Sequence, residues 1–162
     1  DLGAIIMKPL YFGLFVNILI PMVVLLICYY IETHGSMHNR LGLDAATYFY
    51  IFAAIAFAEA GFALWFRMKL MARPMIRSLA TVEVDIKEQL QKRLRPIFVM
   101  VAAISIWGVV FYLLTGRFNE ALMFVVFSFV VFQFIRPRYG SVQKLIDKQT
   151  AMAERGELLR SA

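Results

Sequence analysis

The sequence predicts an all-α, polytopic membrane protein, and two observations support this class. The first is composition: 61% of the 162 residues are hydrophobic, more than a soluble domain of this size can bury. The second is spacing. A hydrocarbon core of roughly 30 Å needs about 20 apolar residues at a rise of ~1.5 Å per residue, and four stretches approach or exceed that length, at residues 10–31, 45–66, 97–115 and 121–135.

The connections between these stretches predict how they pair. Residues 115–119 leave so little chain between the third and fourth spans that the two must form an antiparallel hairpin. The fourth span is short, so we expect Arg136 and Arg138 to extend their side chains toward the polar surface of the bilayer. We therefore expect four transmembrane helices arranged as two antiparallel hairpins.

The distribution of basic residues predicts the orientation. If the four stretches span a bilayer, all of the 17 Lys and Arg except Arg40 and Arg117 lie on one side of it. Basic residues that flank spans mark the cytoplasmic side, so both termini are expected to be cytoplasmic, in a bacterial inner or plasma membrane. This pattern also accounts for the net charge of +6, and no nucleic-acid partner is expected.

Two polar segments predict cytoplasmic amphipathic helices at about residues 75–95 and 139–158, completing a single membrane domain over residues 1–162. Between Pro74 and Pro96, apolar residues recur at intervals of three and four, as on one face of a helix. These residues are Ile76, Leu79, Val82, Ile86, Leu90 and Leu94. The C-terminal segment has a weaker stripe of the same kind.

Four polar residues predict an intramembrane polar site. Glu59, Asn17, Ser105 and Ser128 each lie eight to ten residues from a basic flank, which places all four roughly 12 to 15 Å inside it. A carboxylate inside a span is costly and persists mainly where it faces other helices, a cavity or a partner. Pro21 has no N–H to bond the carbonyl of Asn17, so we expect Glu59 to face Asn17.

This polar layer has three interpretations: hydrogen bonds that fix helix packing, a site linked to protons or cations, or a contact with a neighbouring subunit. His34 and His38 could form a metal pair only if the loop around Gly35 were helical, so solvated histidines are the better interpretation and no metal site is predicted. No motif for nucleotide binding, metalloprotease activity or a nucleophilic serine is present. No cofactor is expected, and the sequence leans away from an enzyme.

Three functions remain. The leading one is a non-catalytic accessory or assembly subunit of a larger membrane complex, which fits a chain without catalytic motifs. The first alternative is a small oligomeric transporter or channel, linked to protons or cations through Glu59. The second is a membrane sensor or anchor that signals through its cytoplasmic helices. The expected partners are the lipid bilayer and either subunits of a complex or further copies of this chain.

The orientation can be tested by cysteine accessibility. With each position introduced as the only cysteine, residue 78 should react with a membrane-impermeant reagent only after the cells are opened, and residue 36 should react in intact cells, because of the imbalance of Lys and Arg. Labelling of residue 78 from outside intact cells would contradict the orientation.

Overall fold

The computed structural model describes residues 2–35 and 44–159, and all of the regular secondary structure in these residues is helical. Four of its helices, α1 to α4, are long and apolar enough to cross a membrane, as the predicted membrane class requires, and the predicted all-α class is confirmed in the described residues. The elements are α1 (Leu2–His34), α2 (Ala45–Ala72), the short 3₁₀ helix η1 (Leu79–Thr81), α3 (Val82–Thr115), α4 (Phe118–Ile135) and α5 (Tyr139–Glu154).

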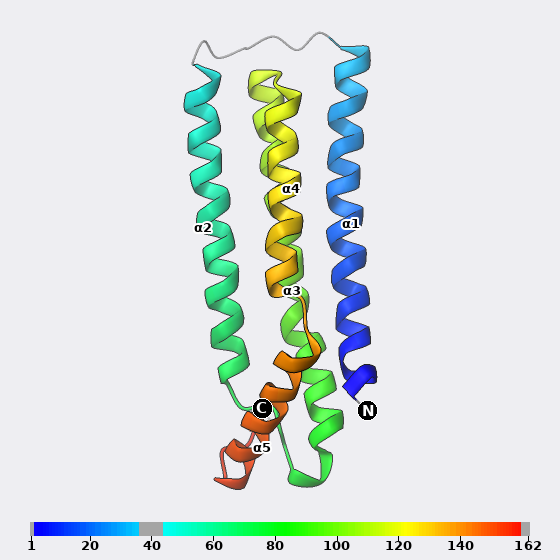
Figure 1. The fold of residues 1–162 in the computed structure, drawn as a ribbon, viewed down its shortest axis with the longest axis vertical. Helices are drawn as coiled ribbons and strands as arrows, with labels where there is room; N and C mark the ends of the chain where they lie inside the picture. The colour runs from blue at the N-terminus through cyan, green and yellow to red at the C-terminus, as the bar shows by residue number, and fades with distance from the viewer. Residues whose placement is uncertain (1, 36–43, 160–162) are drawn as a thin grey trace.

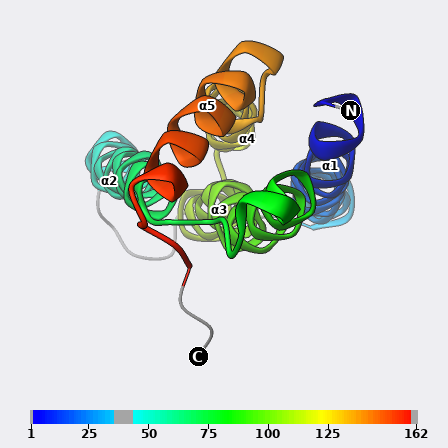
Figure 2. The same ribbon diagram turned by 90° about the horizontal axis from the view of Figure 1, so that it is seen from below.

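Helix α3 is the centre of the bundle. Its contacts with α1, α4 and α2 are the most extensive in the structure, and α1 and α2 lie on opposite sides of the α3 and α4 pair (Figure 1). Seen from below, α3 lies between α1 and α2, while α5 crosses the lower end beside α4 (Figure 2). The hydrophobic core is therefore the surface of α3, where Phe98, Val101, Ile104 and Phe111 are fully buried.

Two glycines allow the neighbouring helices to approach α3 closely. A Cβ at Gly13 of α1 would lie 2.9 Å from the ring of Phe98, and a Cβ at Gly108 of α3 would lie 2.8 Å from the carbonyl oxygen of Ala121 in α4. Small residues at such crossings are typical of helices packed in membranes, where van der Waals contact replaces the hydrophobic driving force.

Helix α3 continues through Pro96, so the two helices expected at 75–95 and 97–115 are one helix that begins at Val82. Proline removes the hydrogen bond to the carbonyl four residues earlier, here that of Lys92. Lys92 is exposed, and a polar solvent can take the place of the missing N–H. The apolar stripe between Val82 and Leu94 and the apolar span after Pro96 thus lie on one continuous helix.

The C-terminus of α2 is held by Arg93 of α3. The last carbonyl groups of a helix have no partners within the helix. The guanidinium of Arg93 donates hydrogen bonds to the carbonyl of Leu70, to that of Arg73 at 3.0 Å and to that of Pro74 at 2.6 Å. One side chain from the central helix therefore supplies hydrogen-bond donors to the backbone carbonyls at the end of α2 and in the turn that follows it.

Gln149 of α5 holds the same turn from the other side. It is 1% exposed. Its amide nitrogen donates to the carbonyls of Met71 at 3.2 Å and Arg73 at 3.1 Å, and its amide oxygen accepts the N–H of Met75 at 2.9 Å. We call Arg93 and Gln149 together the α2 clamp. Through it, α2, α3 and α5 share one hydrogen-bonded junction.

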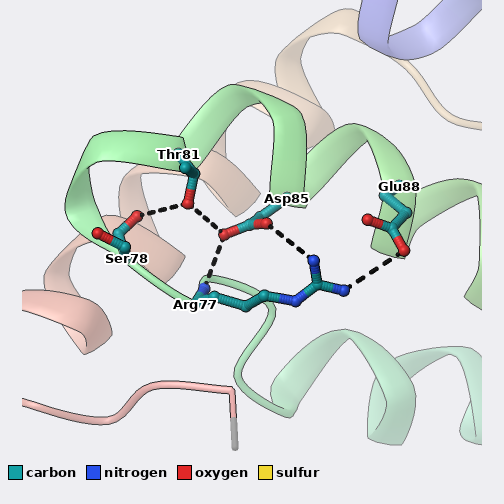
Figure 3. A network of polar contacts seen from close by, with 5 residues as sticks. All are labelled: Arg77, Ser78, Thr81, Asp85 and Glu88. Atoms are coloured by element: carbon teal, nitrogen blue, oxygen red, sulfur yellow. Dashed lines mark hydrogen bonds and ion pairs between the residues drawn. The ribbon is translucent and has the colours of Figure 1, made fainter. Parts of the chain in front are cut away.

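The start of α3 is fixed by a second network (Figure 3). The Asp85 carboxylate accepts the N–H of Arg77 at 2.8 Å and the hydroxyl of Thr81 at 2.7 Å, and the guanidinium of Arg77 lies 3.8 Å from Asp85 and 3.4 Å from Glu88. Burial of Asp85 acts to raise its pKa, but the hydrogen bonds and the charge of Arg77 outweigh it and lower the pKa. A lowered pKa means that the network stabilises the fold at neutral pH and is lost only as the pH falls through that value.

The apolar stripe before Pro96 packs on protein, with one exception. Ile86, Leu90 and Leu94 are at most 3% exposed, whereas Leu79 is 55% exposed. Leu79 lies in η1, outside the α3 helix, so the helical spacing does not carry it to the buried face.

Replacement of Leu90 by Asp should destabilise the protein by about 2 to 5 kcal/mol, because a buried leucine is lost, and reduce the amount of assembled protein. Leu79→Asp is the matched control, expected within about 0.5 kcal/mol of the parent. Thermal unfolding and abundance in the membrane measure both. Equal losses in the two variants would contradict the observed packing.

Candidate functional site

The predicted polar residues lie on α3 or contact it, and Asn17 of α1 is one of those that join two helices. Its side chain, 1% exposed, donates to the carbonyl of Gly13 at 3.0 Å and to that of Phe98 in α3 at 3.2 Å. Its amide oxygen has no partner in the described residues. Asn17 therefore fastens α1 to α3 beside the close contact at Gly13.

The two serines also contact the backbone of α3. Ser128 of α4 donates to the carbonyl of Val101 at 2.9 Å, and Ser105 donates within its own helix to Ala102 at 2.6 Å. Both serines are fully buried. Interhelical hydrogen bonds of this kind contribute about 0.6 kcal/mol each in membrane proteins, which is the contribution expected of packing residues.

Glu59 does not bond to Asn17, so the expected pairing is wrong. Its carboxylate accepts the indole N–H of Trp107 at 2.8 Å, and Asn17 bonds to Phe98 instead. The reason is the position of α3, which separates α1 from α2 (Figure 2). Equal depth in the bilayer placed the two residues in one layer, but depth does not determine which helices are neighbours.

Trp107 is the site residue that the sequence analysis missed. It lies in the span 97–115 and is partly buried, and an indole N–H in an apolar environment needs an acceptor. Glu59 is the carboxylate within a span at comparable depth. The need of the indole N–H for an acceptor is therefore the signal in the sequence by which the pair of Trp107 and Glu59 could have been found.

A further polar contact joins the C-terminal end of α1 to the C-terminal end of α3. The hydroxyl of Tyr112 donates to the carboxylate of Glu32 at 2.5 Å. His34, on the same turn of α1, stacks on Tyr30 with ring centroids 4.5 Å apart. His38 lies outside the described residues, and within the described part of the chain no group of three potential ligands could hold a metal ion.

Two hollows lie on the side of α2 that faces α4 and α5, and none of the four predicted site residues lines either. An apolar hollow of about 120 Å³ separates α2 from α4. A larger groove of about 370 Å³, with basic residues at its rim, lies between α2, α3 and α5. The predicted polar residues thus form separate helix contacts, each of which joins a side chain to α3 or lies within it.

Comparison of the chain with protein-family models, with curated proteins and with solved structures finds no match.

The contact between Glu59 and Trp107 should stabilise the bundle measurably. The chain has two tryptophans, so in a Trp65→Phe background the fluorescence reports on Trp107 alone. Glu59→Gln keeps an acceptor and should leave the emission nearly unchanged, whereas Glu59→Leu leaves the indole N–H unpaired and should shift the emission to shorter wavelength. A double-mutant cycle with Trp107→Phe should give a coupling free energy of about 1 kcal/mol. A coupling indistinguishable from zero would contradict this contact.

Proposed function

We propose that this chain is a non-catalytic integral-membrane accessory or assembly subunit of a larger membrane complex. The observation that carries the proposal is the outward face of α2, opposite the face that packs on α3. Ala54, Ala58 and Gly61 share that outward face and are exposed, and a Cβ at Gly61 would meet nothing within 4 Å.

Small residues at this spacing let another helix approach closely, whereas a surface that meets only lipid gains nothing from them. The packed face of α2 already carries its own small residues, Ala56, Ala60 and Ala63, each at most 5% exposed. Helix α2 therefore has two small-residue faces, and the internal packing uses one of them. A transmembrane helix of another subunit is the partner whose chemistry fits the second.

The polar residues support the same proposal. Asn17 and Ser128 donate to backbone carbonyls of α3, and Glu59 is engaged by Trp107. These contacts hold helices together, as an assembly subunit requires. The proposed placement has α1 to α4 as spans of alternating direction, in which α3 and α4 pack as an antiparallel hairpin and α1 and α2 are antiparallel but lie on either side of α3. Both termini, the start of α3 and α5 are then in the cytoplasm of a bacterial cell. The basic residues at the ends of the spans support it.

Copurification from native membrane tests the proposal. The parent chain should bring down other subunits in fixed stoichiometry, and Gly61→Leu should reduce their recovery at least about tenfold, because a bulky side chain blocks close helix contact. Ile55→Leu, on a different exposed part of α2, is the matched control and should recover them fully. Unchanged recovery with Gly61→Leu would contradict the proposal.

The alternative is a small oligomeric transporter or channel linked to protons or cations through Glu59. What favours it is a half-buried carboxylate inside a span, a position that often marks an ion pathway. Under this alternative the chain would purify as a homo-oligomer without foreign subunits, and Glu59→Gln in reconstituted vesicles would remain folded but lose ion flux.

A further inference from the structure

The groove between α2, α3 and α5 combines an apolar floor with a basic rim. It measures about 370 Å³ and opens where α2 and α4 reach their last turns. Its apolar walls come from all three helices, and its polar positions come from α2 and α5. The lining residues are Arg67, Met68, Met71, Ala72, Leu90, Leu94, Pro137, Ser141, Val142, Lys144, Leu145 and Lys148.

The positive charges at this groove are not neutralised within the described part of the chain. Arg67, Lys144 and Lys148 line it, no Asp or Glu does, and none of the three is ion-paired with a described residue. Asp147, the acid that precedes Lys148, accepts a hydrogen bond from Gln143. The groove therefore presents three cations that have no counter-charge.

Arg67 differs from the two lysines, which are exposed, because part of its charged group is buried. Its Nε is buried and has no hydrogen-bond partner among the described residues. The guanidinium of Arg138 is near enough to repel it electrostatically. A buried guanidinium N–H without an acceptor is costly, and guanidinium groups bind phosphate oxygens well. Burial, repulsion and a missing acceptor together indicate that an anion belongs here.

The apolar hollow between α2 and α4 lies farther along α2 than the groove, and the two share no lining residue. Phe49, Ala53, Phe57 and Phe127 are among its lining residues. From Arg67 to Phe57 is ten residues of α2, or about 15 Å at the helical rise. This is half of a hydrocarbon core of roughly 30 Å. An apolar chain that follows α2 from Arg67 across one leaflet would therefore reach only the near edge of this hollow, at Phe57.

We infer that the groove binds an anionic phospholipid of the leaflet at the basic end of the bundle. The phosphate lies between Arg67, Lys144 and Lys148, and one acyl chain lies against the apolar walls of the groove and along α2. The charge selects an anionic headgroup over a zwitterionic one. The apolar walls of the groove select a lipid over a soluble phosphate. Bound there, the lipid connects α2 and α5 beside the α2 clamp.

Native mass spectrometry and thermal unfolding of the full chain in neutral detergent test the inference. Phosphatidylglycerol should remain bound as a one-to-one adduct and raise the unfolding temperature, and phosphatidylcholine and inorganic phosphate should do neither. The triple variant Arg67→Gln, Lys144→Gln, Lys148→Gln should bind phosphatidylglycerol at least tenfold more weakly. The matched control is Lys8→Gln, Lys69→Gln, Lys92→Gln, which removes equal charge from exposed positions outside the groove and should bind as the parent does.

Three outcomes would overturn the inference. Equal loss of phosphatidylglycerol in the two triple variants would mean that net charge alone attracts the lipid. Equal stabilisation by inorganic phosphate would mean a site for a soluble anion. Equal binding of phosphatidylcholine by the parent would mean that the basic rim does not select the headgroup. None of these results bears on the outward face of α2, so the proposed assembly role is tested separately.

Discussion

The architecture depends on which side chains donate hydrogen bonds to the last backbone carbonyls of α2. A helix that ends beside other helices leaves its last carbonyls without partners, and leaving such groups buried and unpaired costs about 1 to 3 kcal/mol each. Arg93 and Gln149 supply the donors. Because these side chains belong to α3 and α5, the turn after α2 can form fully only when both helices are in place. The α2 clamp thus couples the membrane helices to the segment that follows α4.

That coupling extends to the end of the described chain. After α5, the N–H of Leu159 donates to the carbonyl of Ile76 at 2.8 Å, and Met75 and Ile76 are at most 1% exposed. The turn between α2 and α3 is therefore enclosed by α3 on one side and by α5 with its C-terminal extension on the other. The turn itself has little regular structure, so its order comes from these tertiary contacts.

The sequence predicts the helices well because their signals are local. Apolar length predicts four helices able to span a membrane, and the short connection at 115–119 fits the close packing of α3 and α4. Pro96 was a misleading local signal, since proline disfavours a helix interior yet is tolerated where the freed carbonyl of Lys92 lies at an exposed position. The start of α3 also came later than expected, because Asp85 accepts the N–H of Arg77 and fixes residues before η1 in a non-helical turn.

The candidate site was harder to predict because its contacts depend on which helices are neighbours. Asn17, Ser105 and Ser128 were identified by depth alone, and depth contains no information about the angle around the bundle axis. The central place of α3 follows from Gly13, Gly108 and the large buried rings that they accommodate. Because α3 separates α1 from α2, Glu59 does not meet Asn17, and Trp107 of α3 offers the donor that its carboxylate accepts. The same separation leaves α2 in contact with the bundle along one face, and its opposite face, with Gly61, is exposed.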